Sequence, residues 1–176
     1  MRDPSALPYL AGYPETTLAP VRELLAAGRL GAHVAARYPD RHPYTSSKLL
    51  RGYVAELKQR HLKTAKPVSK VLYDDRLLAV EDALGLHTFR SRAHGAKVRA
   101  TSEIRVAGLF KDAAPQFLRM IVVHELAHLR EREHTKAFYR LCTAMEPDYH
   151  QFEFDLRLLL TAREVEGPRG TGEPEA

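Results

Sequence analysis

The sequence has few of the residues that characterise several large classes of protein. Cys142 is the single cysteine and tryptophan is absent, which excludes an internal disulfide and a disulfide-stapled fold. We expect Cys142, in an apolar helical stretch, to be a small core residue rather than a nucleophile. No run approaches the roughly 18 apolar residues of a membrane span, and the first residues lack the apolar core of a secretory signal. We therefore expect a cytoplasmic protein without membrane contact.

The sequence also lacks a large excess of basic over acidic residues. Lysine and arginine number 27 against 22 acidic residues, a net charge of +5. Four of the acids lie after residue 163, so the basic surplus is concentrated in the rest of the chain. Such a surplus favours an anionic substrate or partner, including a nucleotide or nucleic acid. Because there is no unbroken basic run and no series of stacking aromatics, solvated basic faces are the simpler explanation.

The most informative segment is 120–134, which reads M-I-V-V-H-E-L-A-H-L-R-E-R-E-H. His124 and His128 are four residues apart and share one face of a helix, so both imidazoles can bind one metal ion. Glu125 stands beside the first histidine, where its carboxylate can act as general base toward a metal-bound water. The flanking residues are apolar nearly all round, which predicts a buried helix. Buried imidazoles and a carboxylate are costly without a partner, so we predict a zinc site rather than ordinary hydrogen-bonded histidines.

A catalytic zinc site needs three protein ligands and a water. His134 is the leading candidate for the third ligand, although on an unbroken helix it would point roughly 120° away and lie about 9 Å further along the axis. The chain must therefore turn after about Arg130. Metzincins place a glycine at the turn, where this chain has Glu131, so their pattern is not met. Spacing alone leaves Glu131, Glu133 and Glu153 as alternative ligands.

The hydrophobic periodicity changes twice along the chain. Helical spacing in the first third, with Ser46 or Ser47 as a cap, gives way to strand patterns and then to helices, the metal-site helix beginning near Pro115. The predicted strands are Val68–Tyr73, Leu84–Arg92, Lys97–Thr101 and Glu103–Phe110, and the last two predicted helices are Lys136–Met145 and Tyr149–Arg163. This order predicts one α+β domain over residues 1–163 with a small, mostly antiparallel or mixed sheet. A disordered acidic tail follows at 164–176.

The stretch F-L-R-M-I-V-V-H-E-L-A-H-L-R-E-R-E-H-T-K-A-F-Y, followed by M-E-P-D-Y-H-Q-F-E-F-D-L-R, closely resembles the YgjP-like group of bacterial metallopeptidases. The pieces Y-L-A-G-Y-P, K-V-L-Y-D and A-L-G-L-H-T extend the resemblance over roughly residues 9–162. It implies a zincin-like fold, zinc held by His124, His128 and His134, and Glu125 as catalytic base. The SprT and WLM metalloproteases are more distantly similar. Many family members have asparagine where this chain has Glu133.

The site and the resemblance together predict a zinc metallopeptidase that acts on a peptide or protein. Tyr149 and His150 are weak candidates for stabilising the oxyanion, and Glu153 and Asp155 could orient the ligands. The resemblance also implies that the strand Glu103–Leu109 pairs with an extended substrate. Two alternatives remain: a metal-dependent hydrolase of a nucleoside triphosphate, that is, a pyrophosphatase, and a non-catalytic binding module stabilised by zinc.

Overall fold

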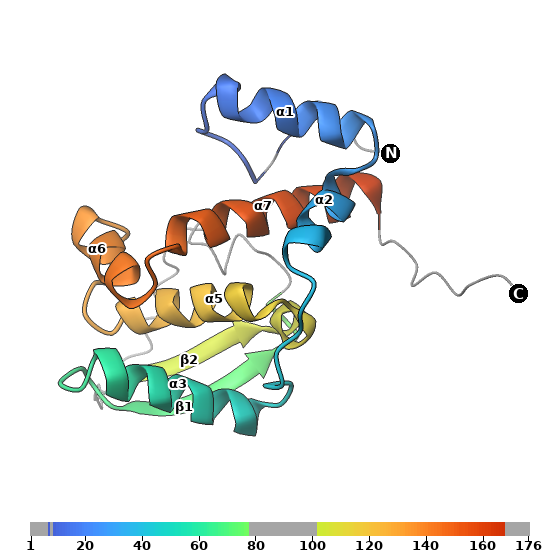
Figure 1. Cartoon of the computed structure of the whole chain (residues 1–176). Coiled ribbons are helices and arrows are strands. Elements are labelled where there is room, and N and C mark those ends of the chain that lie inside the picture. The colour runs from blue at the N-terminus through green and yellow to red at the C-terminus, as the bar shows by residue number, and fades with distance from the viewer. Residues whose placement is uncertain (1–6, 8, 78–101, 168–176) are drawn as a thin grey trace, which may run out of the picture. The chain divides into compact units, whose positions relative to one another are not determined.

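The computed structural model describes residue 7, residues 9–77 and residues 102–167, and the chain divides into two compact units (Figure 1). Residues 1–39 with 150–176 form the first unit and residues 40–149 the second. The described residues contain six α-helices, a 3-10 helix and a two-stranded sheet, in agreement with an α+β protein. The strands predicted at 84–92 and 97–101 lie outside the described residues. The single domain at 1–163 and the disordered tail stay predictions.

The sheet of the second unit pairs β1 (Val68–Asp74) with β2 (Ser102–Ala107) in parallel, with Val71 opposite Ile104. Of the two predicted alternatives, a mostly antiparallel or a mixed sheet, this parallel pair is compatible only with the mixed one. The physical reason is the connection, because the intervening residues 75–101 exceed the dozen or so that a parallel crossover needs.

β2 ends at Ala107, before the strand end predicted at residue 110. The chain continues as the 3-10 helix η1 (Gly108–Asp112). Gly108 permits a close approach at this point, since a Cβ there would lie 1.8 Å from Oδ1 of Asp75. The alternating pattern in the sequence continues past Gly108, but in the structure the strand ends there.

Three helices complete the second unit, and their bounds are close to those expected: α3 (Ser47–His61), α5 (Pro115–Ala127) and α6 (Lys136–Met145). α3 lies against β1, and α5 contacts β2, α3 and α6 (Figure 1). The Ser46 hydroxyl accepts a hydrogen bond from the Leu49 amide and so caps α3, and Pro115 occupies the first turn of α5, both as predicted. Leu49 of α3 is 48% exposed.

Helix α5 lies at the centre of the hydrophobic core of the second unit. Nine of its residues are buried: Phe117, Leu118, Met120, Ile121, Val122, Val123, His124, Leu126 and Ala127. A helix that is apolar on nearly every face is stable only when neighbouring elements cover it, as α3, α6 and β2 do here. Neither α5 nor any other described helix is long and apolar enough to cross a membrane.

The first unit consists of α1 (Glu15–Ala26), α2 (Leu30–Arg37) and α7 (Tyr149–Glu166), the last from His150 onward. α7 continues three residues beyond the end predicted at residue 163. The Glu166 carboxylate accepts hydrogen bonds from the amides of Leu30, at 2.9 Å, and Gly31, at 3.3 Å. These amides begin α2 and have no partner within their own helix, so a contact distant in sequence accounts for the extra turn of α7.

The carboxylate of Asp74 joins the ends of the two strands in the second unit. Asp74 is 6% exposed and accepts hydrogen bonds from Nε and the backbone amide of Arg76, each at 3.0 Å, and from Nη1 of Arg105 at 2.8 Å. The hydrogen bonds from Arg76, and then that from Arg105, hold the pKa of Asp74 well below its usual range. Folding therefore favours the ionised carboxylate.

We expect Asp74→Asn to lower the free energy of unfolding at pH 7, and the deficit to shrink as the pH falls below about 4. A depressed native pKa stabilises the fold only while the unfolded carboxyl is ionised, so acid removes the advantage of the wild type. Urea unfolding of both proteins between pH 7 and pH 3 measures the difference. The control is Glu56→Gln, which removes an exposed ion pair with Arg60 and should change little at any pH. A deficit of Asp74→Asn that is independent of pH would contradict the assignment.

Candidate metal centre

The three histidines predicted as ligands meet at one point in the second unit. The Nε2 atoms of His124, His128 and His134 are mutually 3.2 Å apart. In a tetrahedral site with Zn–N bonds of about 2.0–2.1 Å, ligand nitrogens are about 3.3–3.4 Å apart, so the spacing suits a metal ion at their centre. Within the described ranges, this is the one cluster of His, Cys, Asp or Glu side chains arranged to hold an ion.

The end of α5 brings His134 back to the other two histidines. α5 stops at Ala127, earlier than the turn predicted near Arg130, and the amides of Arg130 and Glu131 both bond to the carbonyl of Ala127, each at 3.0 Å. The chain thus tightens and reverses without a glycine. α6 then begins with Thr135 as N-cap, its side chain accepting from the Phe138 amide at 3.4 Å. His134 lies in the short connection between these two helix ends.

The second nitrogen of two imidazoles has its own partner. His128 Nδ1 lies 3.0 Å from the carbonyl oxygen of Glu131, and His124 Nδ1 lies 2.7 Å from the hydroxyl of Tyr149. A carbonyl can only accept, so His128 carries its proton on Nδ1 and, when neutral, presents a bare lone pair at Nε2. Burial lowers the pKa of His128 and so favours this neutral form.

The protonation pattern of the imidazoles indicates whether the site suits a metal ion. Since His128 Nε2 has no proton, hydrogens on the other two imidazoles could satisfy at most two of the three contacts between Nε2 atoms. A cation at the centre satisfies all three lone pairs at once. The donor set of three neutral imidazoles suits zinc and other first-row transition metals, and the residues present therefore fit such an ion.

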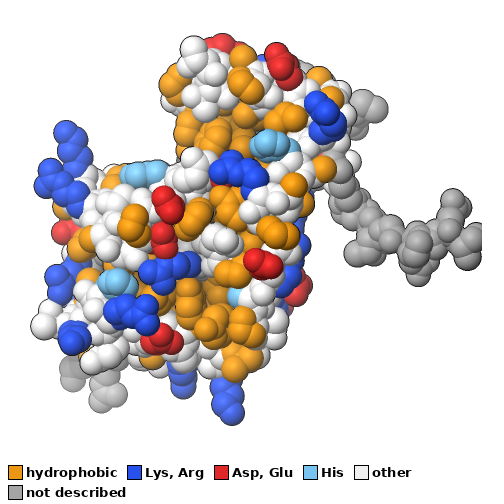
Figure 2. All heavy atoms as spheres, viewed as in Figure 1, with side chains coloured by type: hydrophobic (Ala, Val, Ile, Leu, Met, Phe, Trp, Pro, Cys, Tyr) orange, Lys and Arg blue, Asp and Glu red, His pale blue; other side chains and the backbone are white. Residues whose placement is uncertain are grey.

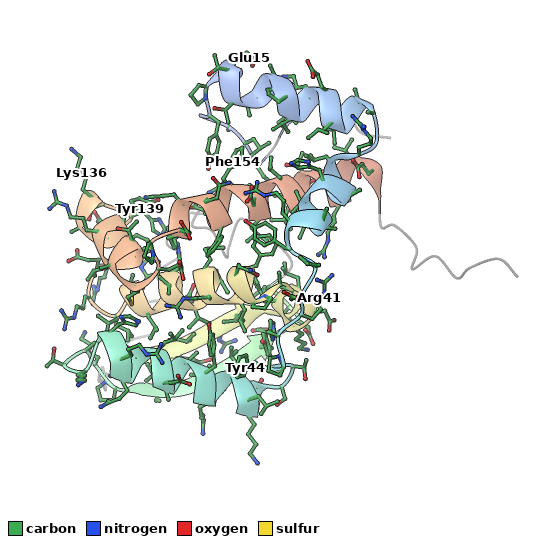
Figure 3. The ribbon with its side chains drawn as sticks, viewed as in Figure 1. Glu15, Arg41, Tyr44, Lys136, Tyr139 and Phe154 are labelled. Atoms are coloured by element: carbon green, nitrogen blue, oxygen red, sulfur yellow. The ribbon has the colours of Figure 1, made fainter. Side chains whose placement is uncertain are left out.

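A buried aromatic ring supports the cluster from α6. Phe138 is fully buried, and its ring centroid lies 4.6 to 4.9 Å from the centroids of all three imidazoles. Two other residues of α6, Lys136 and Tyr139, are labelled in Figure 3, and Lys136 extends outward from the start of the helix. Sequence reasoning did not identify Phe138, because its contact with the histidines depends on how α6 packs against α5.

Glu125 follows His124 on α5 and so projects about 100° around the helix axis from it. Burial raises the pKa of Glu125 to about 7, while the residue as a whole remains partly accessible. A dication nearby would act in the opposite direction and favour the carboxylate. A carboxyl group balanced in this way near neutral pH is suited to accept and return a proton.

The alternative ligands have other surroundings. Glu131 contributes its backbone carbonyl to His128, and Glu133 is exposed. In the first unit, Glu153 pairs with Arg157 at 2.9 Å. None of the three carboxylates joins the histidine cluster that the described residues form.

The other residues considered for the site also lie outside the histidine cluster or contact only its outer side. Asp155 is buried and accepts hydrogen bonds from Tyr38 and Arg37 within the first unit. His150 is exposed. Tyr149, considered for oxyanion stabilisation, instead faces Nδ1 of His124, the nitrogen directed away from the other imidazoles.

Three convergent imidazoles, with the Glu125 carboxylate on the helix that carries the first of them, suit a metal-dependent hydrolase. The family model described as YgjP-like, metallopeptidase domain, matches residues 36–158. The chain belongs to this family, and the resemblance found in the sequence is confirmed. No solved structure matches the chain significantly.

One curated relative covers almost the whole chain. A protein of Escherichia coli (strain K12) named UTP pyrophosphatase is 55% identical to this chain over 157 residues. The aligned region spans 89% of this chain and 94% of that protein. The relative is a hydrolase of a nucleotide by its name, whereas the family description refers to peptidases, and both agree on hydrolysis.

We expect His134→Ala to weaken binding of Zn²⁺ by more than the roughly 10- to 100-fold typical of losing an outer partner of a ligand. Removing the His134 imidazole would leave two candidate ligands, His124 of α5 and His128 at the C-cap of that helix. Competition with a chromophoric chelator measures the dissociation constant. The control is His33→Ala, which removes an exposed histidine of α2. Equal affinities for His134→Ala and the wild type would show that His134 is not a ligand.

Proposed function

We propose that this protein is a metal-dependent pyrophosphatase that hydrolyses nucleoside triphosphates, with UTP as substrate. The observation that carries the proposal is the 55% identity to the UTP pyrophosphatase of Escherichia coli over nearly the full length of both chains. From the sequence alone, peptide hydrolysis is expected and this activity is the alternative. Phosphate hydrolases usually employ carboxylate-rich magnesium sites, but histidine-bound transition metals also activate water and polarise oxygens.

The charges near the proposed ligands are compatible with a polyphosphate. Arg132 lies between His128 and His134 in the sequence, Lys136 follows shortly after, and both side chains are exposed. On the face of the molecule in Figure 2, lysine and arginine side chains are scattered among acidic and apolar ones. Local positive charge favours the binding of an anion and does not require an extended nucleic-acid surface.

In the proposed mechanism, His124, His128 and His134 hold the metal and Glu125 is the general base. A bound metal would supply an activated water and a Lewis acid for a phosphoryl oxygen. Glu125 accepts a proton from the attacking water, the water oxygen bonds to the α-phosphorus, and the bond to the bridging oxygen breaks. UTP and water thus give UMP and pyrophosphate. The partly buried setting of Glu125 keeps its pKa near the range in which it can also release that proton.

Peptide hydrolysis is the second candidate, and the description of the family as a metallopeptidase domain favours it. The same residues would serve, with the metal polarising a carbonyl in place of a phosphoryl oxygen. For this activity we retain the proposal that β2 presents an extended substrate. A zincin-like fold and zinc as the native metal are likewise parts of the proposal.

We expect Glu125→Gln to lower the rate of UTP hydrolysis by about 10²- to 10⁴-fold, the usual contribution of a general base. The amide keeps the size of the side chain but cannot accept the proton, so metal content and fold should be retained. Release of pyrophosphate from UTP, and cleavage of an unstructured protein such as casein, are measured in parallel for wild type and variant. The matched control is Glu133→Gln, an exposed glutamate nearby that should keep full activity.

The outcomes separate the candidate functions. Cleavage of casein, but not of UTP, in a manner that depends on Glu125 would replace the proposed activity with peptide hydrolysis. A metal-loaded wild type that hydrolyses neither substrate would favour a zinc-stabilised binding module. Equal UTP hydrolysis by wild type and Glu125→Gln would remove Glu125 from the mechanism.

A further inference from the structure

We propose that Tyr149 is a positioning residue for His124, holding the imidazole so that Nε2 points at the metal. The inference rests on the metal site of the proposed function, but not on which substrate is hydrolysed. The Tyr149 hydroxyl lies 2.7 Å from His124 Nδ1. Tyr149 is fully buried and His124 is 3% exposed, so bulk water has little access with which to replace this contact.

The direction of the hydrogen bond follows from metal binding. A neutral imidazole that ligates through Nε2 carries its proton on Nδ1, and that proton needs an acceptor. The phenolic oxygen of Tyr149 is placed to accept it. The two rings are nearly parallel, with an interplanar angle of 17° and centroids 6.4 Å apart, so they lie end to end along this one hydrogen bond. Tyr149 thus limits rotation of the imidazole and favours the tautomer with the proton on Nδ1.

The segment that carries Tyr149 is itself tied to the helix of the ligands. Arg119 of α5 pairs through Nε with the carboxylate of Glu146, and its Nη2 donates to the carbonyl of Met145 at 2.8 Å. The Tyr149 amide donates to the Glu146 carbonyl at 3.0 Å. Glu146 is 8% exposed, so this clamp is largely shielded from water.

Arg119 and His124 therefore hold the same segment from two points on one helix. The contacts form a closed circuit from α5 through residues 145–149 and back to α5, all within the second unit. Such a circuit keeps the Tyr149 hydroxyl in place relative to the imidazole that it orients. Outer partners of metal-bound histidines fix the tautomer and the ring orientation in the same way, and their loss typically costs about 10- to 100-fold in metal affinity.

Tyr149→Phe tests the inference because it removes one oxygen and keeps the ring. We expect the dissociation constant for Zn²⁺, measured by chelator competition on the full chain, to rise about 10- to 100-fold. The visible absorption spectrum of the Co²⁺-loaded variant should also shift, because the ligand is free to rotate. The matched control is Tyr73→Phe. Tyr73 is 7% exposed, and its hydroxyl donates to the Tyr44 carbonyl at 2.6 Å.

The control separates positioning from general loosening of the core. Both variants should melt below the wild type in the absence of metal, because each loses a buried hydrogen bond. The inference holds if Tyr149→Phe alone loses metal affinity and alters the Co²⁺ spectrum. It is overturned if Tyr149→Phe binds Zn²⁺ as tightly as the wild type, or if Tyr73→Phe loses as much.

A measurement on the wild type keeps the inference testable if Tyr149→Phe does not fold. In the Zn²⁺-loaded protein, the Nδ1 proton of His124 should exchange slowly with solvent, because it is buried and hydrogen-bonded. NMR spectra of the histidine imidazole N–H groups measure this exchange. Exchange as fast as that of the exposed His33 imidazole would overturn the inference. A wild type that binds no Zn²⁺ at all refutes the proposed metal site, whereas normal binding by both wild type and Tyr149→Phe refutes only the role of Tyr149.

Discussion

The second unit is organised around three imidazole nitrogens whose lone pairs a single cation would satisfy together. The Nε2 atoms of His124, His128 and His134 lie 3.2 Å apart, and the proton on Nδ1 of His128 directs a lone pair toward the other two. Their convergence requires that α5 stop at Ala127, that the chain reverse over the next residues, and that α6 begin at once. The fold thus holds the three imidazoles in an arrangement that could bind a metal ion at their centre.

The same constraint accounts for polar groups in the most apolar helix of the protein. An imidazole buried in α5 is tolerated when both of its nitrogens are satisfied. His124 has Tyr149 on one side, and His128 has a backbone carbonyl. The ion pair of Arg119 with Glu146 then connects one of these partners to α5. Each polar contact near the site thus depends on the next, and the surrounding apolar side chains keep water from replacing them.

Local signals in the sequence were sufficient for much of this. The cap at Ser46, the proline at the start of α5 and the bounds of α6 were predicted because each depends on residues within a few positions. Features set by distant contacts were not. The parallel pairing of β1 and β2 depends on how a long connection runs, and α7 extends to Glu166 because that carboxylate binds the start of α2. The role inferred for Tyr149 requires a contact across 25 residues, which no periodicity reveals.

The triad and its carboxylate leave the nature of the substrate open, because a metal-bound water attacks phosphorus or carbonyl carbon by the same transfer of a proton to Glu125. Selectivity between a nucleotide and a peptide must therefore come from residues that bind the parts of the substrate that do not react. A triphosphate needs several cationic or N–H donors around its oxygens, whereas an extended peptide needs a strand edge. Near the histidines, the exposed Arg132 and Lys136 alternate with acidic residues, and in the described sheet β2 pairs with β1 along one edge only, so neither feature by itself selects one substrate. The proposal of a phosphoanhydride substrate therefore rests on the 55% identity to the UTP pyrophosphatase, and not on the charges or the sheet.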